Sequence, residues 1–191
     1  MTLSGLEAEP KGDSSPNLDT HIEDALTALE AIGEPTILAG HSYGGMVVTG
    51  VADRAPELVS GLVYIDAYLP ADGDSCWTLA NDRFRKIFIR GAGADGHWIR
   101  PRDPDPRARP HPLASLVQRI RLTGNGLADV SRDYIYLSGW ADSPFTAVYE
   151  RLREDPAWRT HELHTGHSIA LEAPAELARV LLDIADQLRP S

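Results

Sequence analysis

Gly40-His41-Ser42-Tyr43-Gly44 decides the fold of this 191-residue chain. The stretch lies between a short apolar run, Thr36–Ala39, and Gly45–Val48, where a helix is expected to begin. A strand, a G-x-S-x-G turn and a helix together form the context of a nucleophile elbow. A sharp, strained turn there holds a serine hydroxyl above a sheet, and only glycine is expected to fit two positions before and after it. The sequence therefore predicts that Ser42 is a nucleophile.

Strands and helices are expected to alternate along most of the chain. Thr20-His21-Ile22-Glu23 is a capping box that predicts the start of a helix ending at Gly33. The expected elements after the elbow are strands at Leu62–Ile65, Tyr134–Leu137 and Arg159–His164 and helices at Phe145–Glu154 and Pro174–Leu188. This alternation predicts an α/β fold with a mostly parallel, doubly wound sheet in a single domain of residues 1–191.

Residues 68–130 interrupt the alternation and are expected to form a helical and irregular cap insertion. Five prolines fall within Pro101–Pro112, which excludes a regular element there. Short helices are expected near Ser75–Ile89 and Pro112–Leu122. Insertions over the active face of such folds commonly shape the substrate pocket, and its candidate walls are Tyr68, Trp77 and Trp98.

A serine nucleophile needs a base, and the base needs a carboxylate that orients it. His167 follows the last expected strand, in Thr165-Gly166-His167-Ser168, so it should reach the same sheet edge as Ser42. Two acids follow strands at that edge, Asp142 and Asp66. We favour Asp142 as the catalytic acid, because its strand is the one next to the histidine loop, and we expect Asp66 to cap or brace a loop. The backbone N–H of Tyr43 is the expected oxyanion donor.

No metal or other cofactor is expected. The spacing of His161, His164 and His167 suggests a metal site, but the first two lie three residues apart on an expected strand and so point to opposite faces.

The chain carries 28 acidic and 18 basic residues, a net charge of −10, without a basic cluster, which disfavours nucleic acids and anionic membranes as partners. The single cysteine, Cys76, and the lack of a recognisable signal peptide favour a cytoplasmic location.

The chain resembles the α/β-hydrolase superfamily, specifically the branch of plant methylesterases, hydroxynitrile lyases and bacterial esterases. The similar segments span nearly the whole chain: Thr2–Leu6, Leu18–His21, Ala39–Val47, Ala52–Glu57, Tyr64–Ala67, Gly139–Phe145 and Thr165–His167. The family's acid lies three residues before a phenylalanine, which supports Asp142. Hydroxynitrile lyases carry a lysine where this chain has Ser168, which disfavours cyanohydrin chemistry.

The resemblance implies hydrolysis of a small or medium carboxylic ester through an acyl-serine intermediate, without a cofactor. Members of the family also begin with a strand, a His-Gly loop, a helix and a second strand, and the sequence lacks a match to them. We therefore expect an incomplete oxyanion hole, which costs on the order of 10²–10³ in rate. We also expect an exposed sheet edge at Thr36–Ala39, through which two copies can pair as a homodimer.

Three interpretations of this difference stay open. The sequence is a fragment of an active esterase, a short hydrolase that completes its site by dimerisation or with another loop, or a catalytically weak remnant that binds a ligand or partner. The retention of Ser42, His167 and a suitable acid favours the first two.

Overall fold

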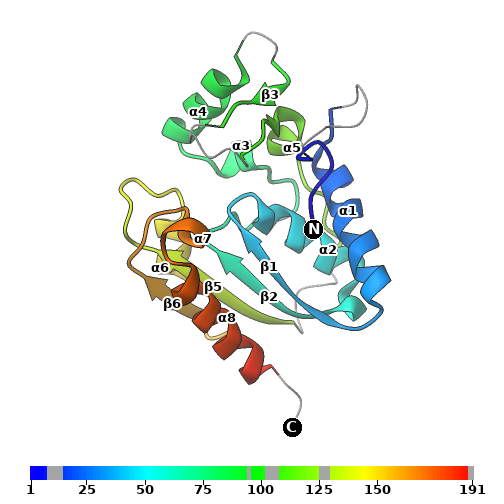
Figure 1. Ribbon diagram of the computed structural model, residues 1–191, viewed down its shortest axis with the longest axis vertical. Helices are drawn as coiled ribbons and strands as arrows, with labels where there is room; N and C mark the ends of the chain where they lie inside the picture. Colours follow the sequence, from blue (N-terminus) through cyan, green and yellow to red (C-terminus); the bar gives the residue numbers. More distant parts are fainter. Residues whose placement is uncertain (8–14, 94–95, 102–107, 125–129, 189–191) are drawn as a thin grey trace.

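The computed structural model describes residues 1–7, 15–93, 96–101, 108–124 and 130–188 (Figure 1). Its centre is a four-stranded sheet in the order β1-β2-β5-β6. The strands are β1 (Thr36–His41), β2 (Val59–Ile65), β5 (Ser131–Leu137) and β6 (Arg159–Leu163). All three neighbouring pairs are parallel. The expected α/β fold with a mostly parallel sheet is confirmed.

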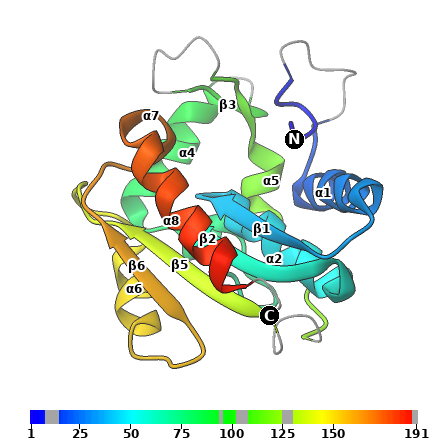
Figure 2. The same cartoon turned by 60° about the horizontal axis from the view of Figure 1, so that its bottom comes forward.

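Helices cover both faces of this sheet, because the strand residues point alternately to opposite sides. Tyr64 and Tyr134 pack into a core with α1 (Leu18–Ile32), α2 (Gly44–Arg54) and α6 (Thr146–Leu152). Their chain neighbours, such as Ile65 and Ile135, pack on the other face with α7 (Ile169–Glu172) and α8 (Pro174–Gln187). Figure 2 shows α8 running across the sheet on the face away from α6. A short 3-10 helix, η1 (Pro56–Leu58), leads into β2.

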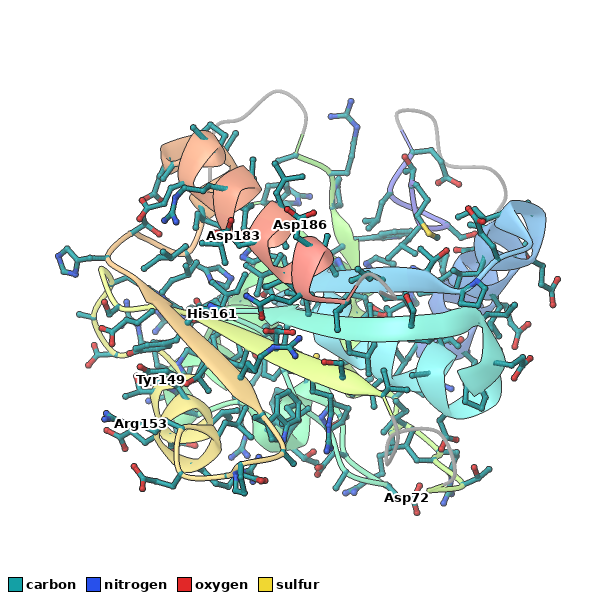
Figure 3. All side chains as sticks on the ribbon, turned by 90° about the horizontal axis from the view of Figure 1, so that it is seen from below. Asp72, Tyr149, Arg153, His161, Asp183 and Asp186 are labelled. Atoms are coloured by element: carbon teal, nitrogen blue, oxygen red, sulfur yellow. The ribbon has the colours of Figure 1, made fainter. Side chains whose placement is uncertain are left out.

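The labelled side chains of α6 and α8 also lie on opposite sides of the sheet. Figure 3 shows Tyr149 and Arg153 on α6 at one side of the sheet, and Asp183 and Asp186 on α8 at the other. Tyr149 stacks on Tyr136 of β5, with ring centroids 4.5 Å apart. The sheet is thus the middle layer between two layers of helices.

The chain between β2 and β5 lies outside the four-stranded sheet, and we call its described residues between 68 and 130 the cap. The cap contains α3 (Cys76–Leu79), α4 (Asp82–Ala92), β3 (Trp98–Ile99), β4 (His111–Pro112) and α5 (Leu113–Val117). Figure 1 shows these elements together above one end of the sheet. Half of the proline-rich run, residues 102–107, lies outside the described residues.

The start of α1 differs from its prediction. The helix begins at Leu18, and the side chain of Asn17 accepts a hydrogen bond from the backbone N–H of Thr20. The Thr20 hydroxyl in turn accepts from the Asn17 N–H, so Thr20 is the third helical residue and not the cap. Gly33 ends the helix as expected, in a left-handed conformation with φ 74°. Within the described ranges no helix combines the length and apolar character that crossing a membrane would need.

Candidate active site

Ser42 occupies a strained turn between β1 and α2. Its φ is 55°, a left-handed value that is unfavourable for a residue with a side chain. Two backbone hydrogen bonds hold the turn: the Ser42 N–H donates to the Ile65 carbonyl, and the Tyr68 N–H donates to the Ser42 carbonyl, both at 3.1 Å. The turn is therefore fixed to the end of β2, and it has the geometry of a nucleophile elbow.

The backbone approaches two glycines of this turn closely. Only one of them, Gly40, is at an expected position. A Cβ on Gly40 would lie 2.6 Å from the carbonyl oxygen of Gly44, so Gly40 needs to be glycine. A Cβ on Gly44 would meet no atom within 4 Å. The second tight position is Gly45, where a Cβ would collide with the backbone carbonyl of Tyr68. The expectation that Gly44 is sterically required is wrong, because the loop after β2 approaches Gly45 instead.

His167 lies after β6 and pairs with a buried carboxylate. Its Nδ1 is 2.7 Å from Oδ2 of Asp66, a residue with no exposed surface at the end of β2. Asp66 and His167 therefore meet across the end of β5, the strand between their own strands. A histidine with one ring nitrogen bound to a carboxylate is held in the orientation of a general base.

Asp142 does not contact His167, so the structure differs here from the preference for Asp142 as the acid. Its side chain is 74% exposed and pairs with Arg83 of α4, with 2.8 Å between Nη1 and Oδ2. The loop after β5 turns Trp140 inward instead, and the indole N–H of Trp140 donates to Oδ2 of Asp66 at 3.0 Å. The structure thus places Asp66, the second acid considered, beside the histidine.

Asp66 also has a strained backbone, with φ 43°. Its N–H donates to the Ile135 carbonyl at 2.7 Å, and its Oδ1 lies 3.4 Å from the Leu137 N–H. The sequence signal for it is its position directly after the apolar segment Leu62–Ile65, which forms the end of β2, the strand that pairs with β1.

His41 links the elbow to the histidine loop. Its Nε2 donates to the His167 carbonyl at 2.9 Å, and the two rings are 4.5 Å apart. Among the described residues no hydrogen bond joins the Ser42 hydroxyl to His167. In structures without substrate, catalytic hydrogen bonds are often long and shorten when substrate binds. Ser42, His167 and Asp66 thus each follow a strand at the same end of the sheet, and Asp66 binds the His167 ring.

Tyr43 stands at the N-terminus of α2, where backbone N–H groups lack intrahelical acceptors. Its ring is held by His21 of α1, whose Nδ1 lies 2.7 Å from the phenol oxygen. The other nitrogen of His21 donates to the Ser4 carbonyl at 2.9 Å, so Nδ1 accepts from the phenol. Burial lowers the pKa of His21 and raises the pKa of Tyr43, which keeps both groups neutral at pH 7.

A cavity of about 180 Å³ opens beside Ser42 and Tyr43. Tyr68, a predicted wall, lines it. Trp77 lines a separate cavity with Ile89, and Trp98 packs near Gly5, so neither is a wall of this cavity. Five further walls were not predicted from the sequence and come from the cap and from the loop after β5: Phe84, Phe88, His111, Leu116 and Phe145.

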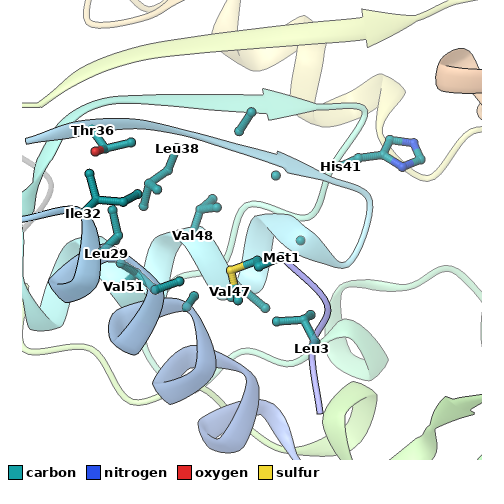
Figure 4. A pocket seen from close by; sticks show the side chains of 15 residues that line it. Met1, Leu3, Leu29, Ile32, Thr36, Leu38, His41, Val47, Val48 and Val51 are labelled. Atoms are coloured by element: carbon teal, nitrogen blue, oxygen red, sulfur yellow. The ribbon is translucent and has the colours of Figure 1, made fainter. Parts of the chain in front are cut away.

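A second, larger groove of about 370 Å³ runs along β1 (Figure 4). Its walls are mostly apolar side chains of α1, α2 and β1, including Leu29, Leu38 and Val48. Among the described residues β1 pairs only with β2, so this groove follows an unpaired strand edge. His41 lies at one end of the groove, close to the elbow.

The described residues contain no group of three histidine, cysteine or carboxylate side chains placed to hold a metal ion. His161 binds Asp133, with 2.9 Å between Nε2 and Oδ1, and the guanidinium of Arg159 shares that carboxylate. His161 and His167 thus bind different aspartates.

Comparison with known proteins identifies the family. The alpha/beta hydrolase family matches residues 3–180. A carbendazim hydrolyzing esterase from Nocardioides sp. is 36% identical over 205 residues, covering 93% of this chain and 82% of the relative. The fold is similar to that of an extracellular alpha/beta-hydrolase from a Paenibacillus species, with a TM-score of 0.79 at 19% identity over 95% of this chain and 84% of the other.

A pyrethroid hydrolase from Sphingobium faniae has a similar fold, with a TM-score of 0.70 and 21% identity over 96% of this chain and 84% of the other. These two solved structures support the assignment of the fold. The family match and the esterase relative together support membership of the family. The chain belongs to the alpha/beta hydrolase family.

Proposed function

We propose that this protein hydrolyses carboxylic esters with Ser42 as nucleophile, His167 as general base and Asp66 as the orienting acid. The observation that carries the proposal is the 2.7 Å contact between His167 and the buried Asp66 at the same sheet edge as the strained Ser42 turn. A buried carboxylate is costly unless it is hydrogen-bonded, so its place beside a histidine and an elbow favours a catalytic role.

The reaction follows from these positions. Nε2 of His167 takes the proton of Ser42 as the serine oxygen attacks the ester carbonyl. Asp66 stabilises the imidazolium through Nδ1, and the Tyr43 N–H donates to the negative carbonyl oxygen. The C–O bond to the alcohol breaks, and His167 returns its proton to the leaving oxygen. Water then attacks the acyl-serine with the same base, which releases the acid and restores Ser42.

The substrate class is a small or medium ester. The cavity beside Ser42, about 180 Å³, is smaller than the roughly 300–1,000 Å³ of sites for drug-sized ligands. The carbendazim hydrolyzing esterase supports an esterase assignment, since it is 36% identical over most of both chains. The Tyr43 N–H is one oxyanion donor of the proposed site.

A second candidate is a catalytically weak hydrolase-fold protein that binds a ligand or partner. The apolar groove along β1 favours it, because such a surface suits binding and lies outside the catalytic cavity.

A fluorophosphonate probe that reacts with activated serines separates the two candidates. Stoichiometric labelling of Ser42, lost in Ser42→Ala and in His167→Ala, is expected for the esterase. Ser138→Ala, at a serine after β5, is the matched control and should label normally. Absence of labelling in folded native protein, shown by an intact circular dichroism spectrum, would instead favour the binding protein.

A further inference from the structure

One imidazole stands among the aromatic walls of the cavity beside Ser42. His111, at the start of β4, lines this cavity with Ser42 and Tyr43, and its ring centroid is 4.7 Å from that of Tyr43. The other walls are mainly aromatic and aliphatic side chains of Tyr68, Phe84, Phe88, Leu116 and Phe145. The proposed reaction gives His111 no role.

The hydrogen bonds of His111 fix the position of its proton. The buried Ser115 hydroxyl donates its single proton to the Pro112 carbonyl at 2.8 Å, because a carbonyl only accepts. The same hydroxyl lies 2.8 Å from Nε2 of His111, so it accepts there from an Nε2–H. Burial and, to a smaller extent, the nearby His21 lower the pKa of His111 to about 4. The imidazole is therefore neutral at pH 7, and Nδ1 carries a lone pair.

Nδ1 of His111 accepts no hydrogen bond from any residue that the structure describes. Nδ1 is also not fully buried. Among the described residues, the fully buried side-chain nitrogen and oxygen atoms that lack a hydrogen-bond partner belong to Glu7 and Arg132, and Nδ1 of His111 is not one of them. A strong acceptor thus remains accessible on a residue that forms the wall of the cavity. A substrate without a donor would leave this nitrogen unpaired on desolvation, which is unfavourable.

We propose that His111 is a specificity-determining residue that accepts a hydrogen bond from an N–H or O–H group on the aromatic part of an ester substrate. The aromatic walls supply the preference for a flat ring, and His111 supplies the preference for a donor on that ring. The inference rests on the proposed esterase function of Ser42 and names the substrate class of that same site.

Matched indole esters test the proposal. The acetates of 3-, 4- and 5-hydroxyindole carry a ring N–H at different positions, and their N-methyl counterparts lack it. The native protein should favour the N–H member of at least one pair in kcat/KM by roughly 3- to 10-fold, the size expected for one neutral hydrogen bond. His111→Phe should abolish the preference, and His111→Asn, which keeps an acceptor oxygen, should retain part of it.

His164→Phe is the matched control, because His164 is an exposed histidine outside the cavity, and it should leave the preference unchanged. Fluorophosphonate labelling of Ser42 in each variant verifies that the site is folded. The proposal is overturned if the native protein discriminates in none of the pairs, or if His111→Phe keeps the discrimination.

A binding measurement distinguishes failure of this inference from failure of the proposed function. If the native protein neither labels nor hydrolyses, the esterase function fails. Titration calorimetry with indole and 1-methylindole then still decides the role of His111, with tighter binding of indole, lost in His111→Phe, as the expected result. Equal affinity of the native protein for both compounds overturns the inference.

Discussion

Two hydrogen bonds meet on one oxygen of Asp66, one from the imidazole of His167 and one from the indole of Trp140. Trp140 also packs against His167 at 4.8 Å and against Phe84 of the cap at 5.9 Å, measured between ring centroids. The indole therefore connects Asp66, His167 and the cap, and we infer that it positions the carboxylate for His167.

Trp140→Phe tests this positioning role. The phenyl ring retains much of the packing but removes the N–H, and a hydrogen bond to a charged group contributes about 1.5–3 kcal/mol. We expect kcat for an aryl ester to fall roughly 10-fold with little change in KM, since the acid acts on the reaction and not on binding. Trp77→Phe, in a separate cavity, is the control and should retain native kcat. Equal kcat values for the two variants would argue against a positioning role.

His111 also makes stability depend on pH. The unfolded chain takes up a proton on this histidine below pH 6.5, whereas the folded protein takes it up only near a pKa of about 4. Acid therefore favours unfolding, and His111 alone should lower the free energy of unfolding by about 2 kcal/mol between pH 7 and 5. Urea unfolding at both values should show that His111→Phe loses about 2 kcal/mol less than the native protein. Equal losses would contradict the assignment of a neutral His111 in the folded protein.

At the scale of elements, the close approach of α2 to the loop after β2 depends on Gly45 and not on Gly44. Gly45→Ala should lower the free energy of unfolding by about 1–3 kcal/mol, the usual cost of overpacking, and slow the labelling of Ser42. Gly44→Ala is the matched control, because its methyl group enters open space and the change should be neutral or stabilising. Differential scanning calorimetry compares the two, and a larger loss in Gly44→Ala would contradict the geometry.

The regular elements were predictable because their apolar patterns are strong. β1, β2 and β5 contain their predicted segments, although β2 and β5 begin three residues earlier than predicted, and β6 ends at Leu163, one residue before its predicted end. The helix from Pro174 ends within one residue of its prediction. The cap helices were placed only roughly, since short helices depend on tertiary packing more than on local pattern.

The candidate site was predictable in part, because the strands that carry two of its residues have strong apolar patterns. Ser42 and His167 follow strands whose ends meet at one edge, and the structure brings both to it. The acid could not be decided from the sequence, because Asp66 and Asp142 both follow strands at that edge. The two acids differ in position because the loop after β5 turns Trp140 inward and leaves Asp142 exposed beside Arg83.

At the scale of the whole molecule, the unpaired edge of β1 and its apolar groove distinguish one side of the sheet. Pairing of two copies through this edge stays a prediction, because unpaired strand edges readily pair with other chains. Light scattering should give twice the mass of one chain, and Leu38→Lys, which places a charge in the groove, should give the single mass. A single mass for the native protein would contradict pairing of two copies.

The central claim is that Asp66, and not Asp142, acts with His167 and Ser42. The most direct measurement compares Asp66→Asn with Asp142→Asn in kcat for hydrolysis of 4-nitrophenyl acetate, with fluorophosphonate labelling of Ser42 as a second readout. We expect Asp66→Asn to lose roughly 10³–10⁴-fold in kcat, as loss of the orienting acid does in serine hydrolases. Asp142→Asn should stay within about 3-fold of the native rate, because an exposed ion pair contributes little. A large loss in Asp142→Asn together with near-native activity in Asp66→Asn would contradict the account.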